Sequence, residues 1–249
     1  MILTQEQEMI RDSLRDFAQE RLAPFAAEWD RQHTFPAEAL RELGELGALG
    51  MVVPEEWGGA GMDYMSLVLV IEEIAAGDGA TSTIVSVQNS LACGITMKYG
   101  SDEQKETWLK PLARGEMLGC FCLTEPHTGS DAAAISTRAD RDGDHFVLNG
   151  VKQFITTGKY AQVAIVFAVT DKAAGKKGIS CFLVPTETPG YVVARIEEKM
   201  GQRASDTAQI LFENCRVPAS CLLGKEGDGY RIALSNLEAG RIGIAAQSV

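Results

Sequence analysis

The feature that most constrains the fold is a change of hydrophobic periodicity near Gly115. Before this point, apolar residues recur every three or four positions, as in Leu40, Leu43 and Leu46, which is the spacing of amphipathic helices. After it, short runs of β-branched and aromatic residues are separated by turn sequences such as DGD, TTG and KKG, a pattern typical of strands. Near Glu226 the helical spacing returns. The pattern therefore predicts a helical region, then a β region, then a further helix.

Several helices in the first region have recognisable starts. Thr4 and Gln7 form a capping-box pattern, in which each side chain caps the backbone of the other residue. The sequence SDEQ at Ser101 has the same form. Pro36 stands where helices accept proline, in the first turn. These signals predict helices over residues 4–22, from residue 36 onward, and over 66–76, 80–99 and 102–113.

The β region contains six strand-like runs: MLGCFCLT, HFVLNG, KQFIT, AQVAIVFAV, GISCFLVP and AQILFENC. Such runs predict an antiparallel β-domain of the sandwich or barrel type. The fold class is therefore α+β with several domains. We expect an N-terminal α-helical domain over residues 1–115, a middle β-domain over 116–225, and the first helix of a C-terminal α-helical bundle over 226–249, with no stop signal before the last residue.

Composition excludes several classes of function. The net charge of -11 disfavours nucleic acid and anionic membranes as partners, because both bind basic surfaces. The longest apolar run, Val163 to Val169, is far shorter than the roughly 20 residues of a membrane-spanning helix. The N-terminus has no signal-peptide pattern, so we expect a cytoplasmic protein. The six cysteines form no CxxC pair, which predicts reduced thiols and no metal site.

The decapeptide CLTEPHTGSD, residues 122–131, concentrates polar side chains and admits three interpretations. Ser130, His127 and Asp131 suggest a catalytic triad, but triad members usually come from distant positions and no GxSxG motif surrounds Ser130. A ligand-binding loop is the second interpretation, because Gly129 and Ser130 offer a bare backbone amide and a hydroxyl to a phosphate or a planar ring. The third is an ordinary polar turn. The residues of the decapeptide alone do not decide between the ligand-binding loop and the polar turn.

The same decapeptide resembles the flavin-binding signature of the acyl-CoA dehydrogenase family, usually T/S-E-P-x-x-G-S-D. PEEWGGAGMD resembles a loop of the family's N-terminal helical domain, KQFITTG its second flavin segment, and GDGYRIALSNLEAGRIGIAAQ its first C-terminal helix. The matching segments follow the family's order from about Leu3 to Val249. The resemblance, of the short-chain or branched-chain type, implies the same α, β, α succession of domains.

The resemblance also implies a function in fatty acid metabolism. Family members use FAD to oxidise an acyl-CoA thioester to a trans-2-enoyl-CoA, and an electron-transfer flavoprotein accepts the electrons. A full-length member is expected to be a homo-oligomer, either a tetramer or a dimer. Carried over by position, the expected flavin-binding residues are Phe121, Cys122, Leu123, Thr124, Gly129, Ser130, Phe154, Ile155 and Thr156, and the expected acyl-CoA-binding residues are Ser130, Glu238 and Arg241.

Three positions depart from the family pattern. Phe154 stands where tryptophan is frequent, which keeps ring stacking but removes the indole N–H. Thr128 replaces a small residue, and Thr157 replaces a common asparagine. Without the resemblance, Glu238 and Arg241 would be interpreted as a surface ion pair at i, i+3 spacing.

The catalytic base is not expected within this sequence. Two branches of the family place a glutamate immediately before the arginine that corresponds to Arg241, where this chain has Gly240. Glu238 lies about 200° around the helix from Gly240 and is not expected to replace it. We therefore expect the base beyond Val249, in a C-terminal domain that the sequence lacks, and weak FAD binding by this chain. The alternatives are a flavin oxidase or monooxygenase of the same fold, or a non-catalytic module that binds flavin or acyl-CoA.

Overall fold

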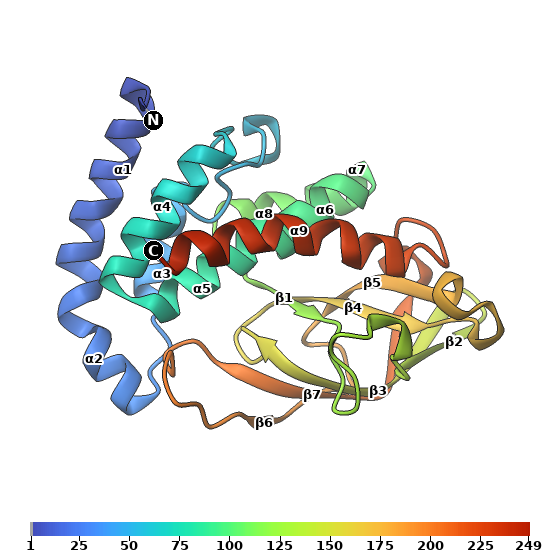
Figure 1. The fold of residues 1–249 in the computed structure, drawn as a ribbon. Helices are drawn as coiled ribbons and strands as arrows, with labels where there is room; N and C mark the ends of the chain where they lie inside the picture. Colours follow the sequence, from blue (N-terminus) through green and yellow to red (C-terminus); the bar gives the residue numbers. More distant parts are fainter. Residues whose placement is uncertain (1) are drawn as a thin grey trace.

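A computed structural model describes residues 2–249, apart from the side chain of Ala239. Figure 1 shows helices gathered on one side of a β-sheet domain, with the C-terminal helix lying along the boundary between them. The two layers share one hydrophobic cluster, in which Ile95 and Leu109 of the helices meet Ile165 of the sheet and Ile232 of the last helix. The site described below lies on and around this boundary.

The N-terminal layer is helical as predicted. Both capping boxes form: Thr4 and Gln7 cap each other, and so do Ser101 and Gln104. The α-helices of this layer are α1 (Gln5–Phe17), α2 (Ala23–Gln32), α3 (Ala37–Glu45), α4 (Tyr64–Gly77), α5 (Gly79–Val87), α6 (Gly94–Tyr99), α7 (Asp102–Gln104) and α8 (Lys110–Ala113), with π-helical turns at Ala18–Leu22, Gln88–Cys93 and Lys105–Leu109.

The π-helical turn Gln88–Cys93 is tied to the sheet through a buried amide. Gln88 Nε2 donates to the carbonyl oxygen of Leu112 at 2.8 Å, and Gln88 Oε1 accepts from the backbone N–H of Gly119 at 3.0 Å. Buried amides of this kind are stable only when they are hydrogen-bonded. The turn, which belongs to a class of distortion common at functional sites, therefore has a fixed position relative to both layers.

The middle region is a β-sheet domain. In the described residues the strand order is β6-β7-β3-β2-β4-β5-β8, with β1 paired to β4. Most pairs are antiparallel, but β1–β4 and β2–β4 are parallel, which the runs of apolar residues did not predict. The strands are β1 (Gly119–Cys122), β2 (Arg138–Asp142), β3 (His145–Thr156), β4 (Val163–Val169), β5 (Ile179–Pro185), β6 (Tyr191–Ile196), β7 (Thr207–Pro218) and β8 (Leu222–Leu223).

The continuous apolar run in β4 is explained by burial on both faces. Val163, Ile165 and Phe167 pack in the cluster shared with the helices. The residues between them pack in a second cluster inside the β-domain. A strand covered on both faces needs apolar residues at every position, so β4 is the structural centre of the chain.

The last helix, α9 (Gly229–Gln247), contacts α4, α5 and β5. Gly243 allows this approach, because a Cβ atom there would lie 2.2 Å from Ser86 Oγ. Elsewhere around its circumference α9 leaves Leu234, Ile242 and Ile244 between 41% and 48% exposed. One face of α9 is therefore packed, and apolar side chains outside that face reach solvent.

Two differences from the predicted strands have a physical reason. HFVLNG and KQFIT form a single strand, β3, interrupted only by irregularities in its pairing. Strands β2 and β6 were not predicted, because most of their residues are exposed and carry little apolar periodicity. The predicted domain boundaries fall in the connections after Ala113 and after Leu223. Among residues 2–249, no helix has the length and apolarity to cross a membrane.

Candidate functional site

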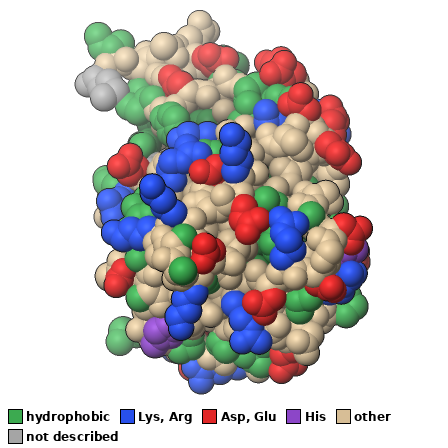
Figure 2. Space-filling model, turned by 90° about the vertical axis from the view of Figure 1, so that its right-hand side faces the viewer, with side chains coloured by type: hydrophobic (Ala, Val, Ile, Leu, Met, Phe, Trp, Pro, Cys, Tyr) green, Lys and Arg blue, Asp and Glu red, His purple; other side chains and the backbone are tan. Residues whose placement is uncertain are grey.

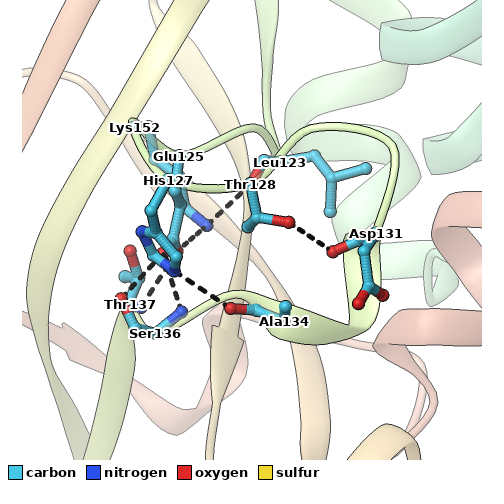
Figure 3. Close-up of polar contacts among 9 residues, drawn as sticks. All are labelled: Leu123, Glu125, His127, Thr128, Asp131, Ala134, Ser136, Thr137 and Lys152. Carbon is cyan, nitrogen blue, oxygen red and sulfur yellow. Dashed lines mark hydrogen bonds and ion pairs between the residues drawn. The ribbon is translucent and has the colours of Figure 1, made fainter.

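The first candidate segment, residues 121–131, is a turn closed by its own backbone. Glu125 N–H donates to the Thr128 carbonyl at 2.9 Å, and Thr128 N–H donates back at 3.1 Å. The Thr128 hydroxyl donates to the Asp131 carbonyl at 2.6 Å, and the Asp131 carboxylate accepts from Ala133 N–H. Hydrogen bonds of this kind hold the loop in one conformation (Figure 3). The threonine at position 128 thus helps to close the turn.

A buried ion pair fixes this segment to β3. Lys152 Nζ lies 2.8 Å from Glu125 Oε1, and both side chains are at most 1% exposed. Lys152 also donates to the Leu123 carbonyl at 3.1 Å, and the Glu125 carboxylate accepts from the backbone N–H groups of Ser136 and Thr137. Buried charges are tolerated only with such partners.

The charge state of this pair follows from its surroundings. Burial opposes ionisation of Glu125, but the Lys152 ammonium and the donors of Ser136 and Thr137 prevail and lower the pKa of the carboxyl from 4.5 to about 2. Burial lowers the pKa of Lys152 despite the attraction of Glu125. A carboxylate held ionised and fully hydrogen-bonded is a structural anchor, not a proton acceptor for a substrate.

The catalytic-triad interpretation of the decapeptide fails on geometry. His127 Nε2 contacts the Ala134 carbonyl oxygen at 3.1 Å and lies 3.8 Å from Glu125 Oε2. Asp131 caps the turn that follows it, so it does not orient the imidazole as a triad acid does. Ser130 is exposed at the tip of the loop. The three residues are neighbours in sequence without forming a relay.

The second segment, residues 152–158, contains a strained aromatic residue. The β3–β7 register passes from Lys152–Ile210 to Ile155–Ala208, so Gln153 and Phe154 form a bulge opposite one residue. Phe154 has φ of 58° and is 61% exposed. A bulky residue in the left-handed region costs about 1 kcal/mol or more and is concentrated at functional sites. Phe154 thus combines a strained backbone with an exposed ring, which makes it a candidate for ligand contact.

The two segments are joined to each other. Gln153 N–H donates to the Thr124 carbonyl at 2.8 Å, so the bulge and the loop after β1 move as one unit. Thr124 and Thr156 are half-exposed, and Gly129 and Ser130 are exposed. The side chains of Cys122 and Ile155 lie in the core of the β-domain, and Leu123 lies in the shared core. Of the predicted flavin residues, these three therefore have side chains buried in the core, where a ligand does not reach them.

An open depression of about 600 Å³ adjoins Thr156. Lys199, Gly201 and Ser205 line it, together with Thr83 of α5. The Ser205 hydroxyl is buried without a hydrogen-bond partner, which is uncommon unless a ligand or water completes the site. Sequence reasoning missed this segment, because the loop before β7 has no periodicity and its role depends on the position of β3.

A groove of about 310 Å³ separates α9 from α5 and its π-helical turn; we call it the α9 groove. Its lining is mainly apolar, and its accessible face follows one stripe of α9. Arg241 lies on this stripe, whereas Glu238 is exposed and does not line the groove. The residues that line it are Ser86, Val87, Ser90, Leu91, Leu237, Gly240, Arg241 and Ile244.

The chain's negative net charge does not exclude anionic ligands. Figure 2 shows lysine and arginine side chains gathered in the upper left part of the face that it displays, with acidic side chains nearby. Lys176 lies 5.1 Å from the centre of the Tyr230 ring, at the start of α9. Local cations of this kind can bind an anion whatever the overall charge.

The chain thus combines a helical layer packed on a β-domain, two segments joined by a backbone hydrogen bond, and an apolar groove along its last helix. Residues 4–116 match the family model of the acyl-CoA dehydrogenase N-terminal domain, and residues 120–215 match that of the middle domain. The chain belongs to the acyl-CoA dehydrogenase family.

Individual relatives agree with this assignment. The mitochondrial short-chain specific acyl-CoA dehydrogenase of Rattus norvegicus is 48% identical over 247 residues, which are 99% of this chain and 60% of that protein. A chain in the solved structure of an electron transferring flavoprotein of Acidaminococcus fermentans has a TM-score of 0.97 and 44% identity, over 99% of this chain and 65% of its own.

A glutaryl-CoA dehydrogenase from Mycobacterium smegmatis, solved in complex with FADH2, has a TM-score of 0.91 and 43% identity. The match covers 98% of this chain and 62% of that one. The chain thus spans between three fifths and two thirds of the length of these relatives.

Proposed function

We propose that this chain supplies the flavin-binding and acyl-CoA-binding surfaces of an FAD-dependent acyl-CoA dehydrogenase that acts on short-chain substrates. The observation that carries the proposal is the joining of the two segments through the bond from Gln153 to Thr124, and the apolar groove along α9 adds a surface for an acyl chain. Relatives named as short-chain specific dehydrogenases support the substrate class.

The described residues fit FAD. A planar ring system needs an exposed flat surface, which Phe154 offers. The polar remainder of the cofactor needs donors and a cation, and the depression beside Thr156 provides the unpartnered Ser205 hydroxyl and Lys199. The solved relative that carries FADH2 supports the choice of cofactor.

Within this proposal each residue has a defined task. Phe154 stacks against the ring system, and the Thr124 hydroxyl donates to its polar edge. Gly129 leaves free for the ligand the space beside Thr124 that a side chain would fill, since a Cβ atom at position 129 would be in ordinary van der Waals contact, 3.8 Å, with Thr124 Cγ2. Ser130 contacts the acyl-CoA. When bound, FAD supplies the acceptor for the two electrons released by α,β-dehydrogenation.

The α9 groove holds the acyl chain and excludes water from it. Arg241, at the rim, orients an adjacent carboxylate and lowers its pKa. Among the described residues that line the groove, none is a carboxylate. We propose that the carboxylate that removes the α-proton comes from outside residues 2–249, and that electrons pass to an electron-transfer flavoprotein, for which the likeness to the Acidaminococcus structure is the support.

Exposed apolar side chains on α9 support further assembly. Leu234 and Ile242 lie outside the α9 groove and are each more than 40% exposed, and exposed apolar side chains favour burial against protein. We propose that the functional protein is a homo-oligomer in which these side chains are covered.

The test is a spectroscopic titration with acyl-CoA. The chain is saturated with FAD, and butyryl-CoA is added while the visible flavin spectrum is recorded, with free coenzyme A as the control. Binding of the thioester beside the ring is expected to perturb the spectrum, and free coenzyme A is expected to change it much less. A flavin spectrum indifferent to butyryl-CoA at saturating FAD would contradict the proposed function.

A further inference from the structure

The bulge that carries Phe154 lies in an unusual place in the sheet. On one side of β7, Gln153 and Phe154 oppose Gln209; on the other side, the β6 register passes from Val193–Ile210 to Arg195–Gln209 and skips one residue. Two bulges therefore flank Gln209. Each bulge interrupts the backbone hydrogen bonds of the ladder, so the ladder is interrupted on both sides of Gln209, next to the residue that carries the exposed phenyl ring.

A row of side-chain hydrogen bonds crosses the sheet at the same level. Gln209 Nε2 donates to Gln153 Oε1 at 2.6 Å, and Gln153 Nε2 donates to Glu197 Oε1 at 2.5 Å. Arg195 Nε donates to the same Glu197 oxygen at 2.8 Å. The row joins β3, β7 and the end of β6, where the backbone ladder is interrupted. We call these four residues the Gln153 row.

Gln153 is the member that touches both candidate flavin segments. Its side chain is 4% exposed, and both ends of its amide are bonded within the row. Its backbone N–H donates to Thr124 of the first segment. The next residue is Phe154, and the energetic cost of its left-handed backbone must be offset by interactions with its surroundings. Because the backbone N–H and both ends of the side-chain amide of Gln153 are bonded, Phe154 has little freedom to change to a less strained conformation.

We propose that Gln153 is a positioning residue, which holds Phe154 outward in its left-handed conformation and so sets the strength of flavin binding, with Glu197 as its anchor. The effect on flavin rests on the proposed function, whereas the effect on Phe154 does not. A preorganised contact surface binds its ligand more tightly, because fewer side chains and backbone segments lose conformational entropy on binding.

The experiment separates these two effects. In a Phe154→Trp background labelled with 5-fluorotryptophan, the introduced indole adds one ¹⁹F resonance to those of Trp29, Trp57 and Trp108. Gln153→Met then removes the amide at similar volume, and Glu197→Ala removes its anchor from the half-exposed side. Gln104→Met is the matched control, since its amide also joins two segments, bonding the carbonyls of Ser220 and Leu222.

We expect the added resonance to be single and sharp in the parent and to broaden or split in Gln153→Met and Glu197→Ala. In the protein with native Phe154, the same two changes are expected to weaken FAD binding about tenfold, a factor measured as Kd by calorimetry. Gln104→Met is expected to alter neither reading. Glu197→Ala keeps the test available if Gln153→Met does not fold.

An added resonance that both variants leave unchanged would overturn the proposal, even if FAD affinity fell, because Gln153 would then not act through Phe154. Unchanged FAD affinity with a split resonance would overturn the link to binding strength. If the parent binds no FAD but the resonance splits, the positioning of Phe154 stands and the proposed function fails.

Discussion

The buried pair of Glu125 and Lys152 offers the sharpest quantitative prediction. Lys152→Met keeps most of the side-chain volume but removes the cation, and it leaves the Glu125 carboxylate buried without its partner. Breaking a buried pair in this way typically costs about 3–5 kcal/mol. The pKa of Glu125 points in the same direction: a carboxyl whose pKa falls from 4.5 to about 2 on folding gains about 3 kcal/mol of stability at neutral pH, a gain that Lys152 shares with the donors of Ser136 and Thr137.

The pH dependence of this stability has a definite sign. Because the folded-state pKa of Glu125 is depressed, its contribution is complete above the unfolded value of 4.5 and is lost as the pH falls from 4.5 towards 2. In Lys152→Met, only the donors of Ser136 and Thr137 still oppose the effect of burial, so the pKa of Glu125 is expected to rise relative to the wild type. The variant is therefore expected to be most destabilised at neutral pH and to approach the wild type in acid.

The assay is urea unfolding followed by circular dichroism at pH 7 and at pH 4, together with thermal unfolding. A loss of 3–5 kcal/mol corresponds to a fall in Tm of about 6–20 °C for a chain of this size. Glu125→Gln and the double variant complete a cycle, in which the second change is expected to cost less once the first is present. A Lys152→Met variant within about 1 kcal/mol of the wild type at pH 7, or additive single changes, would refute the reasoning.

Three further predictions concern α9 and the loop before β7. Gly243→Ala is expected to destabilise the protein by about 1–3 kcal/mol through overpacking, because the new Cβ would lie 2.2 Å from Ser86 Oγ. Gly240→Ala is expected to be tolerated, because its Cβ would lie 3.6 Å from Ser90 Oγ. Urea unfolding measures both variants, and equal losses of stability would contradict the packing described. Burial raises the pKa of Asp206 from 3.8 to about 6, so the stability contributed by its protonated carboxyl is lost as the pH rises from 3.8 to 6. The free energy of unfolding of Asp206→Asn, relative to that of the wild type, should therefore rise between pH 4.5 and pH 7.5. A difference that does not change with pH would refute this assignment. Gly240→Glu places a carboxylate in the α9 groove beside Arg241. Under anaerobic conditions, butyryl-CoA is therefore expected to bleach the flavin of this variant faster than the flavin of the wild type or of Gly240→Gln. Equal bleaching rates in Gly240→Glu and Gly240→Gln would count against a missing base.

Much of the fold follows from local patterns that act over short distances. The capping boxes at Thr4 and Ser101 formed where the sequence placed them, because both partners lie within one helical turn. The apolar run of β4 predicted a strand and, through its lack of alternation, agrees with burial on both faces. Strand β2 was not predicted, because four of its five residues are exposed and the strand has no alternation of apolar residues.

The site was predictable only in part, because its parts meet through long-range contacts. The signature CLTEPHTGSD located the first segment, and the resemblance located the second. Neither gave the bond between Gln153 and Thr124 or the pairing of Glu125 with Lys152, whose partners lie 27 residues apart. The depression lined by Lys199 and Ser205 carried no signal in sequence, because these residues become relevant only when β7 pairs with β3.

The most direct test of whether the two joined segments form the flavin site is calorimetric titration with FAD. FAD is titrated into the wild-type chain and into Phe154→Ala, with Gln104→Met as the control. We expect weak but saturable binding of one FAD per chain, weakened further by at least about tenfold in Phe154→Ala and unchanged in the control. An absence of saturable binding, or an equal affinity in Phe154→Ala, would contradict the assignment of the two joined segments as the flavin site.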